Sequence, residues 1–147
     1  MTASISTVAV GTDGSPTADR ALSAAFELAE RFGARVVVLS AFQAPGRARN
    51  PHLSGGASAG SGWASNAAEQ VERILAAAEE SAAARGLECS TALREGDPGE
   101  VLVNLAEQHG ADVLVVGNQG MERRVLGSVP NTVSHKATCS VLIVKTS

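Results

Sequence analysis

Short apolar runs alternate along the chain with stretches in which apolar residues recur every three or four positions. The runs, most of them rich in valine as buried strands are, fall at residues 6–11, 35–42, 87–95, 113–116 and 140–145. The helical stretches fall at residues 16–32, 63–86, 98–109 and about 128–136. Because parallel strands need crossover connections, this alternation predicts an α/β fold with a five-stranded parallel sheet and helices on both faces.

Two helix starts carry the same signal. Ser15 precedes Pro16, and Asp97 precedes Pro98, so each pair supplies an N-cap side chain followed by proline at the first helical position. Glu100 stands where a capping box would place it and is expected to complete one with Asp97. These signals fix where two of the four helices begin.

Three segments differ from this simple alternation. Residues 43–62 are rich in Gly, Ala, Ser and Pro without apolar periodicity, which predicts a mobile loop inside one domain. Residues 87–95 alternate more than the other runs, which predicts an edge strand. Within residues 140–145, Val141 to Val144 are apolar on both faces, so this strand is either a second edge or an interior strand covered within the monomer.

Composition narrows the class of protein. A chain of 147 residues with 44% hydrophobic residues is expected to form one domain, residues 1–147. The net charge of −3 argues against nucleic acid or an anionic membrane as partner. No targeting signal or membrane-length apolar run is visible, so we expect a cytoplasmic protein. Cys89 and Cys139 lack metal-ligand spacing and are interpreted as packing residues.

Candidate binding residues gather where strands end. Gly11 ends the first strand and Thr12-Asp13 follow it, Gly117 and Gly120 follow the fourth strand, and Gly127-Ser128-Val129 lead into the last helix. Glycine lets backbone N–H groups approach a ligand, and a helix N-terminus adds donors, so these residues suit a phosphate-sized anion. If the first and fourth strands are neighbours, both loops face one crevice. The alternative is that the glycines serve loop geometry only.

The charged residues near these loops leave two roles open. Asp13 could cap the following helix, or it could bind ribose hydroxyls or hold Mg²⁺ through water, and the roles are compatible. Arg123 and Arg124 are interpreted as a solvated turn in preference to phosphate donors. No nucleophile with a neighbouring base and no carboxylate pair can be assembled, so no catalytic residue is predicted.

Four segments resemble the universal stress protein family, and together they span nearly the whole chain. They read VAVGTDGSP, VVGNQG, VLGSVPNTVSHKA and SVLIVK. The resemblance implies the Rossmann-like, adenine nucleotide alpha hydrolase-like fold and binding of ATP or another adenine nucleotide. The implied site comprises Gly11, Thr12, Asp13, Ala41, Gly117, Gly120, Gly127, Ser128 and Val129. Ala41 falls where the family contacts adenine through main chain.

One departure from the family pattern concerns the phosphate loop. Six residues, 121–126, separate Gly120 from Gly127, where the nucleotide-binding members have nine. The shorter loop either favours AMP or cyclic AMP over ATP or merely trims a surface turn.

The resemblance also implies partners and a role. It implies an antiparallel homodimer through Val141, Leu142, Ile143, Val144 and Lys145. The expected function is that of a cytoplasmic stress-response regulator that binds an adenine nucleotide. The alternatives are a dimeric scaffold without nucleotide and a slow ATPase with, at most, weak hydrolysis.

Overall fold

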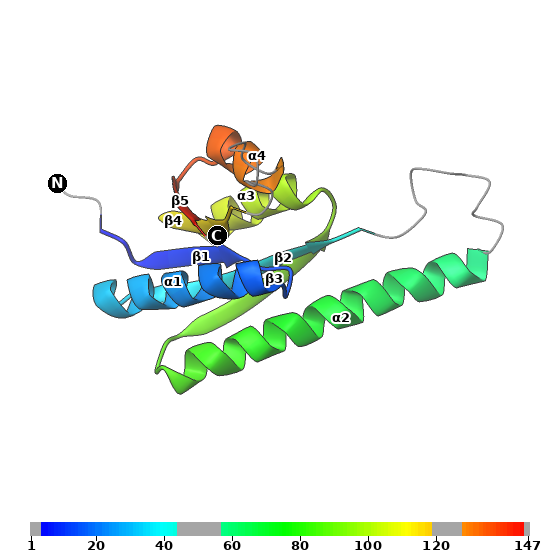
Figure 1. The fold of residues 1–147 in the computed structure, drawn as a ribbon, viewed down its shortest axis with the longest axis horizontal. Coiled ribbons are helices and arrows are strands. Elements are labelled where there is room, and N and C mark those ends of the chain that lie inside the picture. Colours follow the sequence, from blue (N-terminus) through cyan, green and yellow to red (C-terminus); the bar gives the residue numbers. More distant parts are fainter. Residues whose placement is uncertain (1–3, 44–56, 119–127, 146–147) are drawn as a thin grey trace.

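The computed structural model describes residues 4–43, 57–118 and 128–145, with side chains from residue 67 onward in the second range. The elements in chain order are β1 (Thr7–Gly11), α1 (Pro16–Phe32), β2 (Arg35–Phe42), α2 (Ala57–Ala84), β3 (Cys89–Glu95), α3 (Pro98–Gln108), β4 (Val113–Gly117), α4 (Ser128–Lys136) and β5 (Ser140–Val144) (Figure 1). The five strands form one parallel sheet in the order β3-β2-β1-β4-β5. The predicted fold class is confirmed.

Helices cover both faces of the sheet, as Figure 1 shows. Successive side chains of a strand point to opposite faces, so Val8 and Val10 join the core under α1 and α2, while Ala9 joins the core under α3 and α4. The same division holds on β4, where Val115 faces the first core and Leu114 the second. Burial on both faces explains why these strands are apolar without alternation.

The helix N-terminal signals are confirmed, with one correction. Ser15 caps α1 by accepting from the Ala18 N–H at 3.2 Å, and Asp97 caps α3 by accepting from the Glu100 N–H at 3.2 Å. The second half of the predicted capping box is wrong, because the Glu100 carboxylate forms an ion pair with Lys136 of α4. A full positive charge attracts that carboxylate more strongly than the neutral N–H of Asp97 would.

The predicted start of α2 is also wrong. The helix begins at Ala57 and not at Trp63, so residues 57–62 are not loop. Helix formation is cooperative once a turn exists, and the alanine-rich sequence that follows allows the helix to extend into this Gly- and Ser-containing segment. The rest of the predicted loop, residues 44–56, lies outside the described residues. The inner stripe of α2 is confirmed at Leu75 and Ala78, which are buried.

Both edges of the sheet are now assigned. β3 lies at one edge, as predicted, although it begins at Cys89 and not at residue 87. β5 lies at the other edge, which excludes the alternative of an interior strand covered within the monomer. Leu142 on β5 keeps 40% of its surface exposed.

Two further expectations concern cysteines and membranes. Cys89 and Cys139 are both free, and each packs half-buried against one of the two cores, as predicted. Burial, with a smaller contribution from Glu79, raises the pKa of the Cys89 thiol to about 11. Cys89 is therefore a poor nucleophile at neutral pH. Within the described ranges, no helix is long and apolar enough to cross a membrane.

Asp112 ties the amino ends of β1 and β4 together, far from the glycine loops. Its Oδ2 accepts from the N–H groups of Ser6 and Thr7 at 2.9 and 3.0 Å, and these bonds lower the pKa of the carboxyl. We expect Asp112→Ala to lower the free energy of unfolding by about 1 kcal/mol at neutral pH, since the side chain is partly exposed.

The pH dependence of this loss tests its cause. Because the folded-state pKa is lowered, the stabilisation is present above the unfolded value of ~3.9 and is lost as pH falls through the folded value. Urea unfolding of both proteins should show a difference in stability at about pH 7 that shrinks towards about pH 3. An equal difference at both pH values would contradict the carboxylate's role.

Candidate functional site

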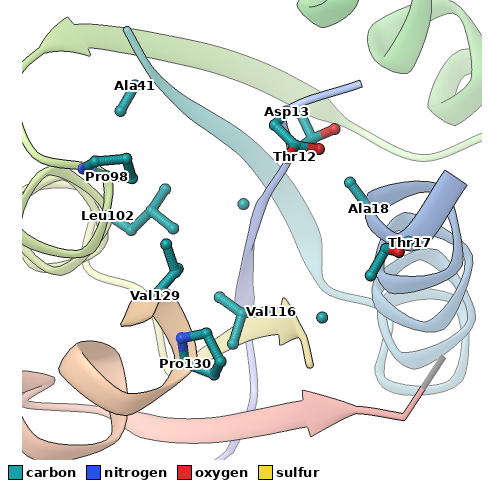
Figure 2. A pocket seen from close by; sticks show the side chains of 12 residues that line it. Thr12, Asp13, Thr17, Ala18, Ala41, Pro98, Leu102, Val116, Val129 and Pro130 are labelled. Carbon is teal, nitrogen blue, oxygen red and sulfur yellow. The ribbon is translucent and has the colours of Figure 1, made fainter. Parts of the chain in front are cut away.

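A cavity of about 270 Å³ opens at the carboxyl ends of β1, β2 and β4 (Figure 2). β1 pairs with β2 on one side and with β4 on the other, so the chain reverses its direction of winding at β1. Ligands of open parallel sheets sit at such a switch point. The neighbouring positions of the first and fourth strands were a condition of the predicted crevice, and that condition is met.

Six of the nine predicted site residues line this cavity. They are Gly11, Thr12, Asp13, Ala41, Gly117 and Val129. Ser128 does not line it; this residue is exposed at the start of α4, next to Val129. The predictions for Gly120, Gly127, Arg123 and Arg124 lie outside the described residues.

Six lining residues were missed by the sequence reasoning. They are Thr17, Ala18, Pro98, Leu102, Val116 and Pro130. Most belong to the first turns of α1, α3 and α4. The N-cap and proline pattern that marks the starts of α1 and α3 is the sequence signal that could have identified them. What could not be seen in sequence was that three helix N-termini converge on one cavity.

The electrostatics of the cavity follow from that convergence. The N-terminal ends of α1, α3 and α4 direct the positive ends of their dipoles towards the same space. Among the described lining residues, Asp13 is the single ionisable one. The cavity therefore combines one carboxylate with a backbone field that favours an anion.

The two sides of the cavity differ in polarity. In Figure 2, Thr12, Asp13 and Thr17 lie on the side of β1 and α1 and carry the oxygen atoms of the view. The opposite side is apolar and is formed by Ala41, Pro98, Leu102 and Val129 (Figure 2). Such a site can accept a flat apolar group on one side and hydroxyl or phosphate groups on the other.

The loop between β1 and α1 is held by its own side chains. Thr12 Oγ1 accepts from the Gly14 N–H at 3.1 Å, and Asp13 Oδ1 accepts from the Ser15 N–H at 2.9 Å. The N-cap of α1 is Ser15, as predicted, so of the two roles left open for Asp13 the capping of this helix is excluded. Asp13 instead closes the turn before the helix while its side chain remains exposed at the cavity.

Two glycines permit close packing behind the cavity. A Cβ on Gly117 would lie 3.0 Å from Thr17 Cγ2, and a Cβ on Gly11 would lie 2.7 Å from Leu102 Cδ1. Both glycines therefore let a helix approach a strand end closely. This close packing supports the alternative that Gly11 and Gly117 serve loop geometry. Both glycines also line the cavity, so a ligand could still contact their backbone.

The fold and the cavity define a class: an open parallel α/β protein with a ligand-sized site at the switch point of its sheet. The family described as the universal stress protein family matches residues 4–145. The chain belongs to this family.

Individual relatives agree with this assignment. The universal stress protein Rv1636 of Mycobacterium tuberculosis (strain ATCC 25618 / H37Rv) is 37% identical, over 95% of this chain and 96% of that protein. The universal stress protein YxiE of Bacillus subtilis (strain 168) is 38% identical over a shorter match, which spans 50% of this chain and 51% of YxiE. A crystal structure of a universal stress protein in complex with cAMP superposes with a TM-score of 0.73, at 32% identity over 99% of this chain and 100% of that one.

Proposed function

We propose that the chain is a regulatory universal stress protein that binds an adenine nucleotide in the cavity at the carboxyl ends of β1, β2 and β4. The observation that carries this proposal is the cavity itself, with one polar side, one apolar side and three helix N-termini around it. A relative 32% identical was crystallised with cAMP, which supports the same class of ligand for this chain.

The proposed orientation follows the polarity of the walls. The base would lie against Ala41, Leu102 and Val129, with the ribose near the Asp13 carboxylate. The phosphate would lie towards Gly117 and the N-terminus of α4, where the helix dipole stabilises negative charge. We propose AMP or cyclic AMP in preference to ATP because only six residues separate Gly120 from Gly127 in the segment expected to contact the phosphates.

Mg²⁺ would accompany a nucleotide with several phosphates. Asp13 fits this ion because its exposed carboxylate stands at the cavity, and Mg²⁺ commonly takes one or two carboxylates together with phosphate oxygens and water. Within the described ranges there is no group of three or more His, Cys, Asp or Glu side chains that could hold a metal by themselves. We therefore propose that any Mg²⁺ arrives with the nucleotide and is held by Asp13 through water.

The test is calorimetric titration of the purified protein with ATP, AMP and cyclic AMP, with and without Mg²⁺. The proposal expects heat of binding for at least one nucleotide. Absence of heat for all of them would favour a scaffold that acts without nucleotide. Phosphate release from ATP at a rate above the uncatalysed background would favour a slow ATPase; the proposed role is regulatory, in the cytoplasm, without efficient turnover.

We also propose a homodimer through Val141–Lys145. β5 is an edge strand, and no strand of the described residues pairs with its outer side, so a second copy could pair there. Two-fold pairing would cover the exposed part of Leu142 in both protomers.

A charge placed on this edge should break the dimer. We expect Leu142→Lys to convert a wild-type dimer into a monomer in sedimentation equilibrium, because two like charges would meet across the two-fold axis. The matched control is Phe32→Lys on α1, where the wild-type side chain is 55% exposed and does not belong to the proposed interface strand. A monomeric wild type, or a dimer that survives Leu142→Lys, would contradict this interface.

A further inference from the structure

Ser40 is a polar residue in the middle of an apolar strand. It lies on β2 next to Ala41, which lines the cavity, and only 1% of its surface is exposed. Its hydroxyl donates a hydrogen bond of 2.6 Å to the carbonyl oxygen of Thr12. A buried hydroxyl is costly unless it is paired, so this bond accounts for a serine inside a run of valine and leucine.

The Ser40 hydrogen bond lies at the point where the chain leaves the sheet and enters the loop between β1 and α1. The β1–β2 ladder ends with the pair Gly11 and Leu39, and Thr12 is the first residue after β1. The Thr12 N–H still donates to the Leu39 carbonyl at 2.9 Å, while the Thr12 carbonyl accepts from the Ser40 side chain. Consecutive residues of β2 thus hold both backbone groups of Thr12 at the point where the chain leaves the sheet.

The position of the residues after Thr12 depends on the two hydrogen bonds that hold the Thr12 backbone to β2. The bonds from Gly14 to Thr12 and from Ser15 to Asp13 are internal to the loop, so they fix its shape. They do not fix its position relative to the sheet. The Ser40 bond joins the loop to the central part of the core, because Ser40 lies on a strand that is buried on both faces.

We propose that Ser40 is a positioning residue for the nucleotide site: through Thr12, its hydroxyl holds Asp13 at the edge of the cavity. This inference rests on the proposed function. Ser40 does not itself line the cavity, so its effect on a ligand is indirect and passes through the β1–α1 loop.

The first test measures the affinity of cyclic AMP by calorimetry. Loss of one hydrogen bond that orders a binding residue should weaken affinity by about 10-fold in Ser40→Ala. Ser40→Cys keeps a side chain of similar shape with a weaker donor, so it should give an intermediate loss. It also serves as the second variant if Ser40→Ala folds poorly. Wild-type affinity in both variants would overturn the proposal.

A double-mutant cycle separates positioning from a general loss of structure. If Ser40 acts through Asp13, then Ser40→Ala should have little further effect in an Asp13→Ala background. Additive losses would overturn the proposed route. The stability control is Asp112→Ala, which removes backbone hydrogen bonds at the opposite end of the sheet and should leave affinity for cyclic AMP unchanged.

The last test needs no ligand and so distinguishes failure of this inference from failure of the proposed function. In the free protein, hydrogen exchange at the Thr12 amide, which donates to the Leu39 carbonyl, should be several-fold faster in Ser40→Ala than in wild type, and unchanged in Asp112→Ala. If exchange is faster but the protein binds no nucleotide, the role of Ser40 in positioning the loop stands and only the proposed nucleotide binding fails. Unchanged exchange would overturn the role of Ser40.

Discussion

Replacing Ala41 with phenylalanine is expected to abolish nucleotide binding while the protein remains folded. Ala41 lines the cavity and is only half-buried, so the added ring would extend into space that the described side chains leave open. The ring would overlap the proposed position of the base, and we expect affinity for cyclic AMP to fall by roughly 100-fold or more, or about 3 kcal/mol. Calorimetry measures the affinity, and thermal unfolding measures the stability.

The matched control places the same ring elsewhere. Ala76 is exposed on α2 and does not line the cavity, so Ala76→Phe should bind cyclic AMP as wild type does. Tight binding by Ala41→Phe would place the ligand away from this cavity. Equal losses in both variants would point to a general effect of the added ring.

Replacing Leu114 with alanine is expected to cause a large loss of stability. Leu114 lies on β4, has no exposed surface, and packs between the sheet and the helices α3 and α4. Truncating a buried leucine removes apolar contacts and leaves a cavity that the surrounding helices fill only in part. We expect the free energy of unfolding to fall by about 2–5 kcal/mol.

Urea unfolding of wild type and variant at one protein concentration gives this difference. Phe32→Ala is a demanding control, since it deletes a larger side chain whose surface is 55% exposed. It should cost less than Leu114→Ala despite the larger deletion. The reverse order would contradict the assignment of the core.

The sheet and its helices could be predicted because local and global signals agree. Valine runs such as residues 35–42 mark strands buried on both faces, and the pairs Ser15-Pro16 and Asp97-Pro98 mark helix starts. The sequence predictions were wrong where the partner of a side chain is distant in sequence. Glu100 left the predicted capping box because Lys136 of another helix lies beside it, and nothing near Glu100 in the sequence shows that contact.

The site could be predicted in part for the same reason. Gly11, Asp13 and Gly117 were identifiable because they end strands, and strand ends meet at one edge of a parallel sheet. Leu102 was assigned only to a helix stripe, because its approach to Gly11 appears only once α3 is packed. Ser40 was read as part of a strand, since its partner, the Thr12 carbonyl, is a backbone group with no signature in the sequence.

The most direct measurement is a titration of isotope-labelled protein with cyclic AMP, followed by amide chemical shifts in NMR. The account predicts that the shifts concentrate at residues 11–18, at Ala41 and at Gly117, around the cavity. Amides at the opposite end of the sheet, such as those of Ser6, Arg35 and Asp112, should stay unchanged. Shifts confined to that opposite end, or no shifts at saturating nucleotide, would contradict the claim that this cavity binds an adenine nucleotide.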